Sequence, residues 1–268
     1  MVQDLANIVL YRRTLWPREQ AFLCASCLLF LASAAASIYL CVHMSGAMPM
    51  PGGWIMSMAW MRMPGQGWFG AAATFMGMWA VMMVAMMLPS LMPQLLSYRR
   101  SLRISGDTHL GLPTAIAGAG YFFVWIAFGA VAYSVGLAVT AIEMRWPALA
   151  QFAPIAIGGV LLLAGSVQLT AWKFRELTHC RNARVSRSPS PDAWKYGLRL
   201  GWHCSLCCLG FMTILLVTGV MSLGFMALVT TAITIERFAL WPERAARVAG
   251  IVVLAVGILV VVRALRGA

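Results

Sequence analysis

The densest group of chemically capable side chains is a run of one histidine and three cysteines, His203, Cys204, Cys207 and Cys208. The run lies in a long apolar stretch that predicts a helix, on which residues three or four apart share a face. His203 then lies beside Cys207, Cys204 beside both Cys207 and Cys208, and Met212 one turn beyond Cys208. Thiolate and thioether are soft donors that suit copper(I), while thiolates also suit zinc and iron–sulfur clusters.

A second pair, His179 and Cys180, precedes this run by about twenty residues and is expected on the same side of the membrane, so the two sets could meet. The alternative for any buried free cysteine is that it packs as a small hydrophobic residue. We expect packing for Cys24, Cys27 and Cys41, since their apolar run has no histidine beside the C-x-x-C spacing.

Methionine is the second chemical signal, with 19 in the chain. One group lies in a loop rich in Gly, Pro and Trp, and comprises Met44, Met48, Met50, Met56, Met58, Met61 and Met63. An exposed loop has no core to fill, and thioethers stay neutral at any pH, so we expect metal capture there. The other group lies on the second apolar run and comprises Met76, Met78, Met82, Met83, Met86, Met87 and Met92. For that group, metal transfer and flexible helix packing remain equal alternatives.

The elements that must position these side chains are long apolar helices. Of 268 residues, 61% are hydrophobic and 10% charged, against about a quarter charged in soluble domains. The apolar runs are Ala21–His43, Gly70–Ser97, Thr114–Ile142, Pro147–Trp172, Leu200–Ile235 and a shorter Val248–Val262. Backbone groups in lipid must be satisfied within their own segment, and no barrel-like alternation is present. The sequence predicts an all-α integral membrane protein, a polytopic bundle of about six transmembrane helices.

Seven spans are the alternative, because Leu200–Ile235 is long for one helix and could fold back near Gly219 or Gly224. The net charge of +12 does not indicate nucleic-acid binding, since the charge lies in the loops between spans, where it sets orientation. With a cytoplasmic N-terminus, 15 of the 20 Lys and Arg residues are cytoplasmic for six spans and 16 for seven. Charge therefore strongly favours this orientation but does not discriminate between six and seven spans, and length favours six.

The expected organisation is a cytoplasmic N-terminal segment, 1–20, and a single transmembrane domain, 21–265. The domain carries a Met-rich external loop, 44–69, and a basic cytoplasmic loop, 174–199. The N-terminus also resembles a signal sequence, but its apolar run continues past the small residues that a cleavage site needs, which favours an uncleaved anchor.

Three further features bear on a site. Pro89 and Pro93, beside Ser90 and Gln94, either kink the second helix at a ligand site or end that helix. Glu236 is the best candidate for a functional acid within a span, with the adjacent Arg237 as an ordinary partner. Gln168 is the notable polar residue of the fourth run.

The second-span run from Met78 to Ser90, MWAVMMVAMMLPS, resembles the signature of a bacterial family of predicted metal-binding integral membrane proteins, among which copper chaperones have been proposed. Later residues are similar to the same family, in the order Trp172-Lys173, His179-Cys180-Arg181, Gly201-x-x-Cys204-x-x-Cys207-Cys208, Met212, Gly219-Val-Met221 and Glu236. The resemblance extends over roughly Gly70 to Gly250. It implies metal binding in a bacterial inner membrane.

The sequence thus predicts a membrane-embedded copper(I)-binding protein that delivers copper or passes it across the membrane, with zinc as the other metal. The expected ligands are Cys204, Cys207, Cys208, His203, His179, Cys180, Met78, Met82, Met83, Met86, Met87 and Met212. Expected partners are the lipid bilayer and a copper-dependent enzyme or periplasmic copper carrier. No catalytic motif is evident, so we do not expect an enzyme. The alternatives are a thiol oxidoreductase using Cys204 and Cys207, and a structural membrane subunit without a metal site.

Overall fold

The computed structural model describes residues 2–44, 47–49, 55–57, 65, 67–106, 109–146, 151–181, 192–219 and 222–267. Within these ranges, the side chains of 2–18, 44, 47–49, 55–57, 181 and 267 are not described. The methionines expected to capture metal in the external loop therefore lie outside the described side chains.

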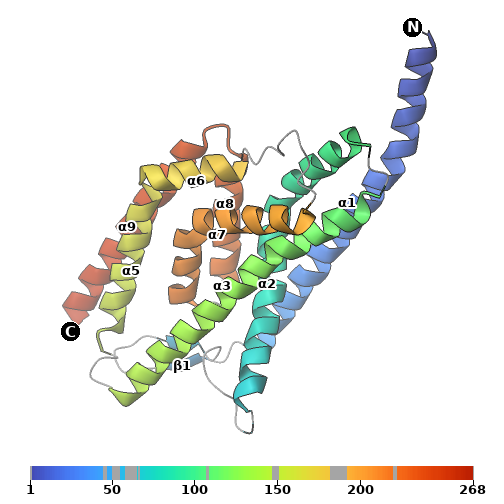
Figure 1. Cartoon of the computed structure of the whole chain (residues 1–268). Helices are drawn as coiled ribbons and strands as arrows, with labels where there is room; N and C mark the ends of the chain where they lie inside the picture. Colours follow the sequence, from blue (N-terminus) through green and yellow to red (C-terminus); the bar gives the residue numbers. More distant parts are fainter. Residues whose placement is uncertain are drawn as a thin grey trace.

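The described part of the chain is almost entirely helical (Figure 1). Its helices are α1 (Val2–Met44), α2 (Trp68–Ile104), α3 (Gly111–Arg145), α5 (Ala153–Gln168), α6 (Ala171–Arg181), α7 (Ala193–Thr218), α8 (Leu223–Phe238) and α9 (Pro242–Gly267). Two short antiparallel strands, β1 (Ala47–Pro49) and β2 (Ile55–Ser57), lie in the expected external loop. Of the described helices, five are long and apolar enough to cross a membrane, or six if α5 and α6, bent by 67°, form one span. The predicted helical membrane fold is confirmed.

The stretch expected as a single fifth span, Leu200–Ile235, is instead two helices. Helix α7 ends at Thr218, and Gly219 has a φ of +121°, which lies in the region that favours glycine. The chain then reverses into α8, as in the seven-span alternative. As a result, α1 begins and α9 ends at opposite ends of the bundle (Figure 1).

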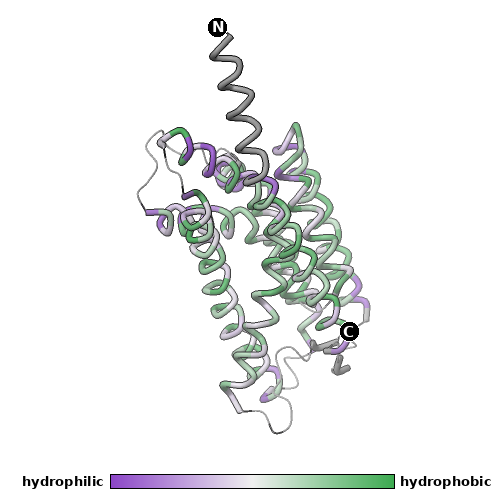
Figure 2. The backbone as a smooth tube through the Cα atoms, turned by 90° about the vertical axis from the view of Figure 1, so that its right-hand side faces the viewer, coloured by the Kyte–Doolittle hydropathy of each residue, from purple (hydrophilic) through white to green (hydrophobic). Residues whose placement is uncertain are grey.

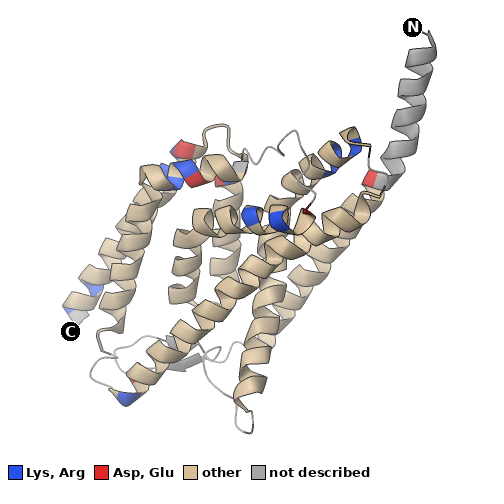
Figure 3. Cartoon of the chain, viewed as in Figure 1, with Lys and Arg blue, Asp and Glu red and all other residues tan. Residues whose placement is uncertain are grey.

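Charge and hydropathy follow this arrangement. Hydrophobic residues run along the helices, and hydrophilic residues gather near their ends (Figure 2). Most described Lys and Arg residues lie toward the end of the bundle that holds α6 and the start of α7 (Figure 3). The segment expected as the basic loop, 174–199, begins inside α6 and ends inside α7. The short apolar run Val248–Val262 belongs to a longer helix, the 26-residue α9.

Glycines allow two pairs of helices to approach closely, as small residues do between membrane helices. Where α3 crosses α7, a Cβ at Gly120 would lie 2.8 Å from the carbonyl oxygen of Trp194, and one at Gly201 would lie 2.8 Å from that of Tyr121. In the α5–α9 pair, a Cβ at Gly165 would lie 3.1 Å from the carbonyl oxygen of Gly250. The α3–α7 crossing brings Tyr121 next to the cysteines of α7.

Helix α2 continues through both Pro89 and Pro93, so the possibility that it ends there is wrong. It packs antiparallel to α1. An ion pair of 2.6 Å joins Arg103 to Glu19, and the Arg99 guanidinium lies 4.4 Å from the centre of the Phe22 ring. These contacts fix the register of the two helices.

Candidate metal centre

Four cysteines from two helices meet in the interior, and we call them the thiol cluster: Cys180 of α6 with Cys204, Cys207 and Cys208 of α7. Each is at most 3% exposed, and none is in a disulfide. The sulfurs of Cys180 and Cys204 lie 3.4 Å and 2.7 Å from the same nitrogen, Nη2 of Arg237. The two cysteine sets that the sequence could only suggest as neighbours therefore meet around one guanidinium.

An arginine from a third helix points into the thiol cluster. Nη2 of Arg237, near the end of α8, lies 2.7 Å from Sγ of Cys204, 3.4 Å from Sγ of Cys180 and 3.5 Å from Sγ of Cys208. A guanidinium is always charged and presents several N–H donors. It can therefore compensate negative charge on these sulfurs in a site from which water is excluded.

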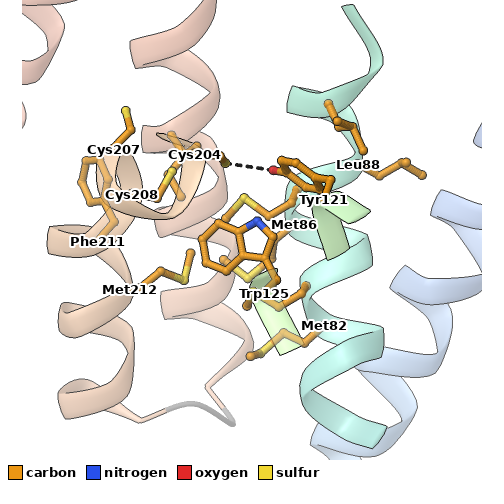
Figure 4. Packing of buried hydrophobic residues seen from close by; sticks show 14 of the residues in the cluster. Met82, Met86, Leu88, Tyr121, Trp125, Cys204, Cys207, Cys208, Phe211 and Met212 are labelled. Carbon is orange, nitrogen blue, oxygen red and sulfur yellow. Dashed lines mark hydrogen bonds between the residues drawn. The ribbon is translucent and has the colours of Figure 1, made fainter. Parts of the chain in front are cut away.

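Tyr121 of α3 closes another side of the thiol cluster. Its hydroxyl oxygen lies 2.9 Å from Sγ of Cys204, and its side chain is 1% exposed (Figure 4). Four helices, α3, α6, α7 and α8, thus supply the polar and sulfur atoms of this site.

A buried ion pair lies next to the thiol cluster and bonds to the backbone of Cys207. Nζ of Lys173 donates to a carboxylate oxygen of Glu236 at 2.8 Å and to the carbonyl oxygen of Cys207 at 2.7 Å. Gln168 donates to the other carboxylate oxygen of Glu236 at 3.0 Å. The Lys173 and Glu236 side chains are 1% and 4% exposed. The pair ties the bend between α5 and α6 to α7 and α8.

The partner of Glu236 is therefore Lys173 rather than the adjacent Arg237. Neighbouring residues on a helix do not face the same way, so α8 directs Glu236 to the ion pair and Arg237 to the sulfurs. Sequence reasoning missed the roles of Arg237, Lys173 and Tyr121. The available signal was a Glu–Arg pair ending an apolar helix, since ionisable residues at membrane depth usually have a specific partner.

The two histidines form a pair of their own. Nδ1 of His203 lies 2.9 Å from a carboxylate oxygen of Glu176, and the His203 and His179 rings stack with centroids 5.4 Å apart. The His203 side chain is 28% exposed. The imidazoles are thus more accessible than the thiols, and His203 has Glu176 as its hydrogen-bond partner.

The methionines of α2 face the protein interior. Met78, Met82, Met83, Met86 and Met87 are each at most 6% exposed, and Met212 of α7 is fully buried. Figure 4 shows Met82 and Met86 one turn apart on α2, with Tyr121 and Trp125 between α2 and α7. All the predicted thioether ligands therefore lie in the core, where packing alone could also place them.

The part of α2 around Pro89 and Pro93 also contacts the thiol cluster. Gln94 donates from Nε2 to the carbonyl oxygen of Cys180 at 2.7 Å. Ser90 is buried, and its hydroxyl has no hydrogen-bond partner among the described residues. The proline-containing segment of α2 thus bonds to α6 through Gln94, and the buried Ser90 hydroxyl in the same segment is without a partner among the described residues.

Among the described residues, no group of three or more His, Cys, Asp or Glu side chains has an arrangement that could hold a metal ion as it stands. At the thiol cluster, Nη2 of Arg237 lies within hydrogen-bonding distance of three of the four sulfurs. Metal binding there requires the sulfurs to turn from the guanidinium toward the ion.

No curated protein and no solved structure matches this chain. A family model described as "PpoB2: Copper chaperone" matches residues 76–260, more than two thirds of the chain. The matched segment includes the α2 methionines from Met78 onward, the thiol cluster, Lys173 and Arg237. This confirms the resemblance that the sequence motifs suggested, and the chain belongs to the PpoB2 copper chaperone family.

Proposed function

We propose that this protein binds copper(I) as its cargo at the thiol cluster and passes it to an acceptor. The observation that carries the proposal is the meeting of four free, buried thiols from α6 and α7 around the guanidinium of Arg237. Thiolates are soft ligands that favour copper(I). Membership of a copper chaperone family supports a role with copper.

Arg237 can stabilise the site both without copper and with copper bound. Without copper, the guanidinium donates to sulfur and satisfies groups that water does not reach. With copper(I) bound by two or more thiolates, the complex is anionic, and the same guanidinium compensates its charge from one side. Such a site holds its cargo without a large change in the charge of the protein interior.

The α2 methionines supply a route to the thiol cluster. Met78, Met82 and Met86 follow one face of α2 at intervals of four residues and are buried. Thioethers bind copper(I) without losing a proton, so an ion can move along them without charging the path. We propose that copper captured by the Met-rich loop 44–69 travels along this stripe.

The proposed setting is the bacterial inner membrane with the N-terminus in the cytoplasm, as the distribution of Lys and Arg favours. The thiol cluster then lies toward the cytoplasmic side. The proposed partner is a copper-dependent enzyme or a periplasmic copper carrier, and zinc is the competing metal.

A thiol oxidoreductase using Cys204 and Cys207 is the alternative class. Reactive cysteines lie in partly exposed sites where a substrate thiol or disulfide can approach. Here the two residues are 0% and 2% exposed, which favours metal storage over exchange with a protein substrate. A structural subunit without a metal site does not explain why an arginine is directed toward three of the four thiols.

The test is elemental analysis of detergent-purified protein after anaerobic loading with copper(I), with zinc as the competitor. The Cys204→Ser/Cys207→Ser protein is compared with Cys24→Ser/Cys27→Ser, which carries the same change in the C-x-x-C spacing of α1. We expect less copper in the first variant than in wild type, and wild-type copper content in the second. Equal copper in wild type and both variants would refute the thiol cluster as the site.

A further inference from the structure

A second pair of sulfurs lies well away from the thiol cluster. Sγ of Cys41 on α1 lies 3.8 Å from Sδ of Met226 on α8, residues separated by 185 positions in the sequence. They are 5% and 6% exposed. The sequence alone indicates only a packing role for Cys41, and it gives no reason to bring Met226 beside it.

The two sulfur sites are distinct. Met226 and Arg237 are eleven residues apart on α8, which places them roughly 16 Å apart along the helix axis at 1.5 Å per residue. Arg237 is at the thiol cluster, while Met226 is in the first turn of α8, next to the reversal at Gly219. Cys41 is in the last turn of α1, close to the Met-rich loop. The second pair thus lies toward the external end in the proposed orientation.

The position of Cys41 matches the outer part of the methionine stripe. Glu19 pairs with Arg103, and Phe22 with Arg99, so α1 and α2 run antiparallel in a fixed register. Because both helices rise by about 1.5 Å per residue, the same register carried along α1 brings Cys41 to the depth between Met78 and Met82. Helix α8 also packs on α2.

A buried polar group without a partner accompanies the sulfur pair. Ser37 lies one turn before Cys41 on the same face of α1, is 6% exposed, and has no hydrogen-bond partner for its hydroxyl among the described residues. Helical side chains lean toward the N-terminus, so the Cys41 sulfur leans over the turn that carries Ser37. A buried hydroxyl left unpaired in lipid-facing helices is costly and needs an explanation.

We propose that Cys41 and Met226 form a second copper(I) site, the first stop for the ion between the Met-rich loop and the thiol cluster. Metal–sulfur bonds of about 2.3 Å can span sulfurs 3.8 Å apart only with a bent geometry, which leaves room for a third ligand. Met82, the buried methionine of α2 nearest to that depth, is the candidate third ligand. The proposal rests on copper(I) as cargo but not on the thiol cluster as its site.

The test is the copper(I) stoichiometry of the full chain after anaerobic loading. Cys41→Ser and Met226→Leu are each expected to bind one copper fewer than wild type, while Cys24→Ser on the exposed face of α1 binds as many as wild type. Met226→Leu nearly conserves side-chain volume, so it keeps the packing if Cys41→Ser disturbs the fold.

The Cys204→Ser/Cys207→Ser variant distinguishes copper binding at the second site from copper binding at the thiol cluster. Wild-type copper content in both Cys41→Ser and Met226→Leu would overturn the second site, even if the α7 variant lost copper. Loss in the Cys41 and Met226 variants alone would support the second site and leave the thiol cluster without its proposed cargo.

Discussion

The chain contains the same C-x-x-C spacing twice, but one pair of cysteines is exposed and the other is buried. Cys24 and Cys27 of α1 are exposed on the outside of the bundle, facing the region that lipid would fill. Cys204 and Cys207 of α7 are buried, with Cys204 in contact with Tyr121 and Arg237. Both pairs lie in long apolar helices, so neither spacing nor hydropathy accounts for the difference.

The difference comes from the neighbouring helices. Gly197 and Gly201 of α7 let α3 approach so closely that no side chain fits between the two backbones. Charged residues of α6 and α8 then reach the cysteines of α7 as a buried ion pair and a guanidinium. Helix α1 contains no glycine that would let another backbone approach Cys24 and Cys27 as closely. A cysteine pair becomes a candidate site here through close packing and charge compensation.

The largest effect is expected from the buried ion pair that only the α7 cysteines have. Lys173→Met leaves Glu236 charged and unpaired, which costs about 3–5 kcal/mol. We expect little folded protein in detergent, measured by thermal unfolding followed by circular dichroism. Lys195→Met removes an exposed ion pair with Asp192 and should cost under about 1 kcal/mol. Equal stability of the two variants would show that the buried pair does not hold the site together.

The next effect concerns the crossing that buries the α7 cysteines. Gly197→Ala forces a Cβ against the backbone of Ala117, and overpacking of this kind costs about 1–3 kcal/mol. We expect lower thermal stability and faster alkylation of Cys204 by a small maleimide. Gly118→Ala, on the open side of α3, meets no atom within 4 Å and should change neither. Unchanged alkylation in Gly197→Ala would show that the α3–α7 crossing is not what keeps Cys204 buried.

Charge compensation is tested at Arg237. Arg237→Met leaves the copper–thiolate complex without its counter-charge, and we expect affinity for copper(I) to fall about tenfold, or 1.4 kcal/mol. Arg237→Lys keeps the charge but loses the planar fork of donors, so its affinity should lie between those of Met and wild type. Competition with a chromophoric copper(I) chelator measures both. Tighter binding by Arg237→Met would mean that the guanidinium competes with copper instead of supporting it.

The smallest effect is expected at Tyr121. Tyr121→Phe removes one hydrogen-bonding hydroxyl from Sγ of Cys204, worth about 0.5–1.5 kcal/mol of folding free energy. Thermal unfolding should show a shift of that size, with copper content unchanged. Loss of copper from this variant would instead make the tyrosine hydroxyl a required part of the site.

Much of the fold could be predicted from the sequence, because long uncharged runs in a membrane have few structural options. The reversal at Gly219 could be named only as an alternative, since hydropathy is the same for one long helix and a tight helical hairpin. The meeting of Cys180 with the α7 cysteines was open for a similar reason. It depends on the bend between α5 and α6, which no local pattern specifies.

The charged partners of the site were harder to predict. Lys173 and Arg237 read as ordinary basic residues at helix ends, and the Glu236–Arg237 neighbours suggested a local pair. Their true partners depend on which way each side chain points from α6 and α8. That direction is set by helix packing over long sequence distances, whereas the face shared by Cys204, Cys207 and Cys208 follows from helical periodicity alone.

The most direct test of copper(I) binding through sulfur is X-ray absorption at the copper edge on anaerobically loaded, detergent-purified protein. We expect copper(I) with a first shell of sulfur at about 2.3 Å, a length typical of metal–thiolate bonds, and less bound copper in Cys204→Ser/Cys207→Ser than in wild type. A shell made only of nitrogen or oxygen, or wild-type copper content in that variant, would contradict copper(I) binding at the thiol cluster.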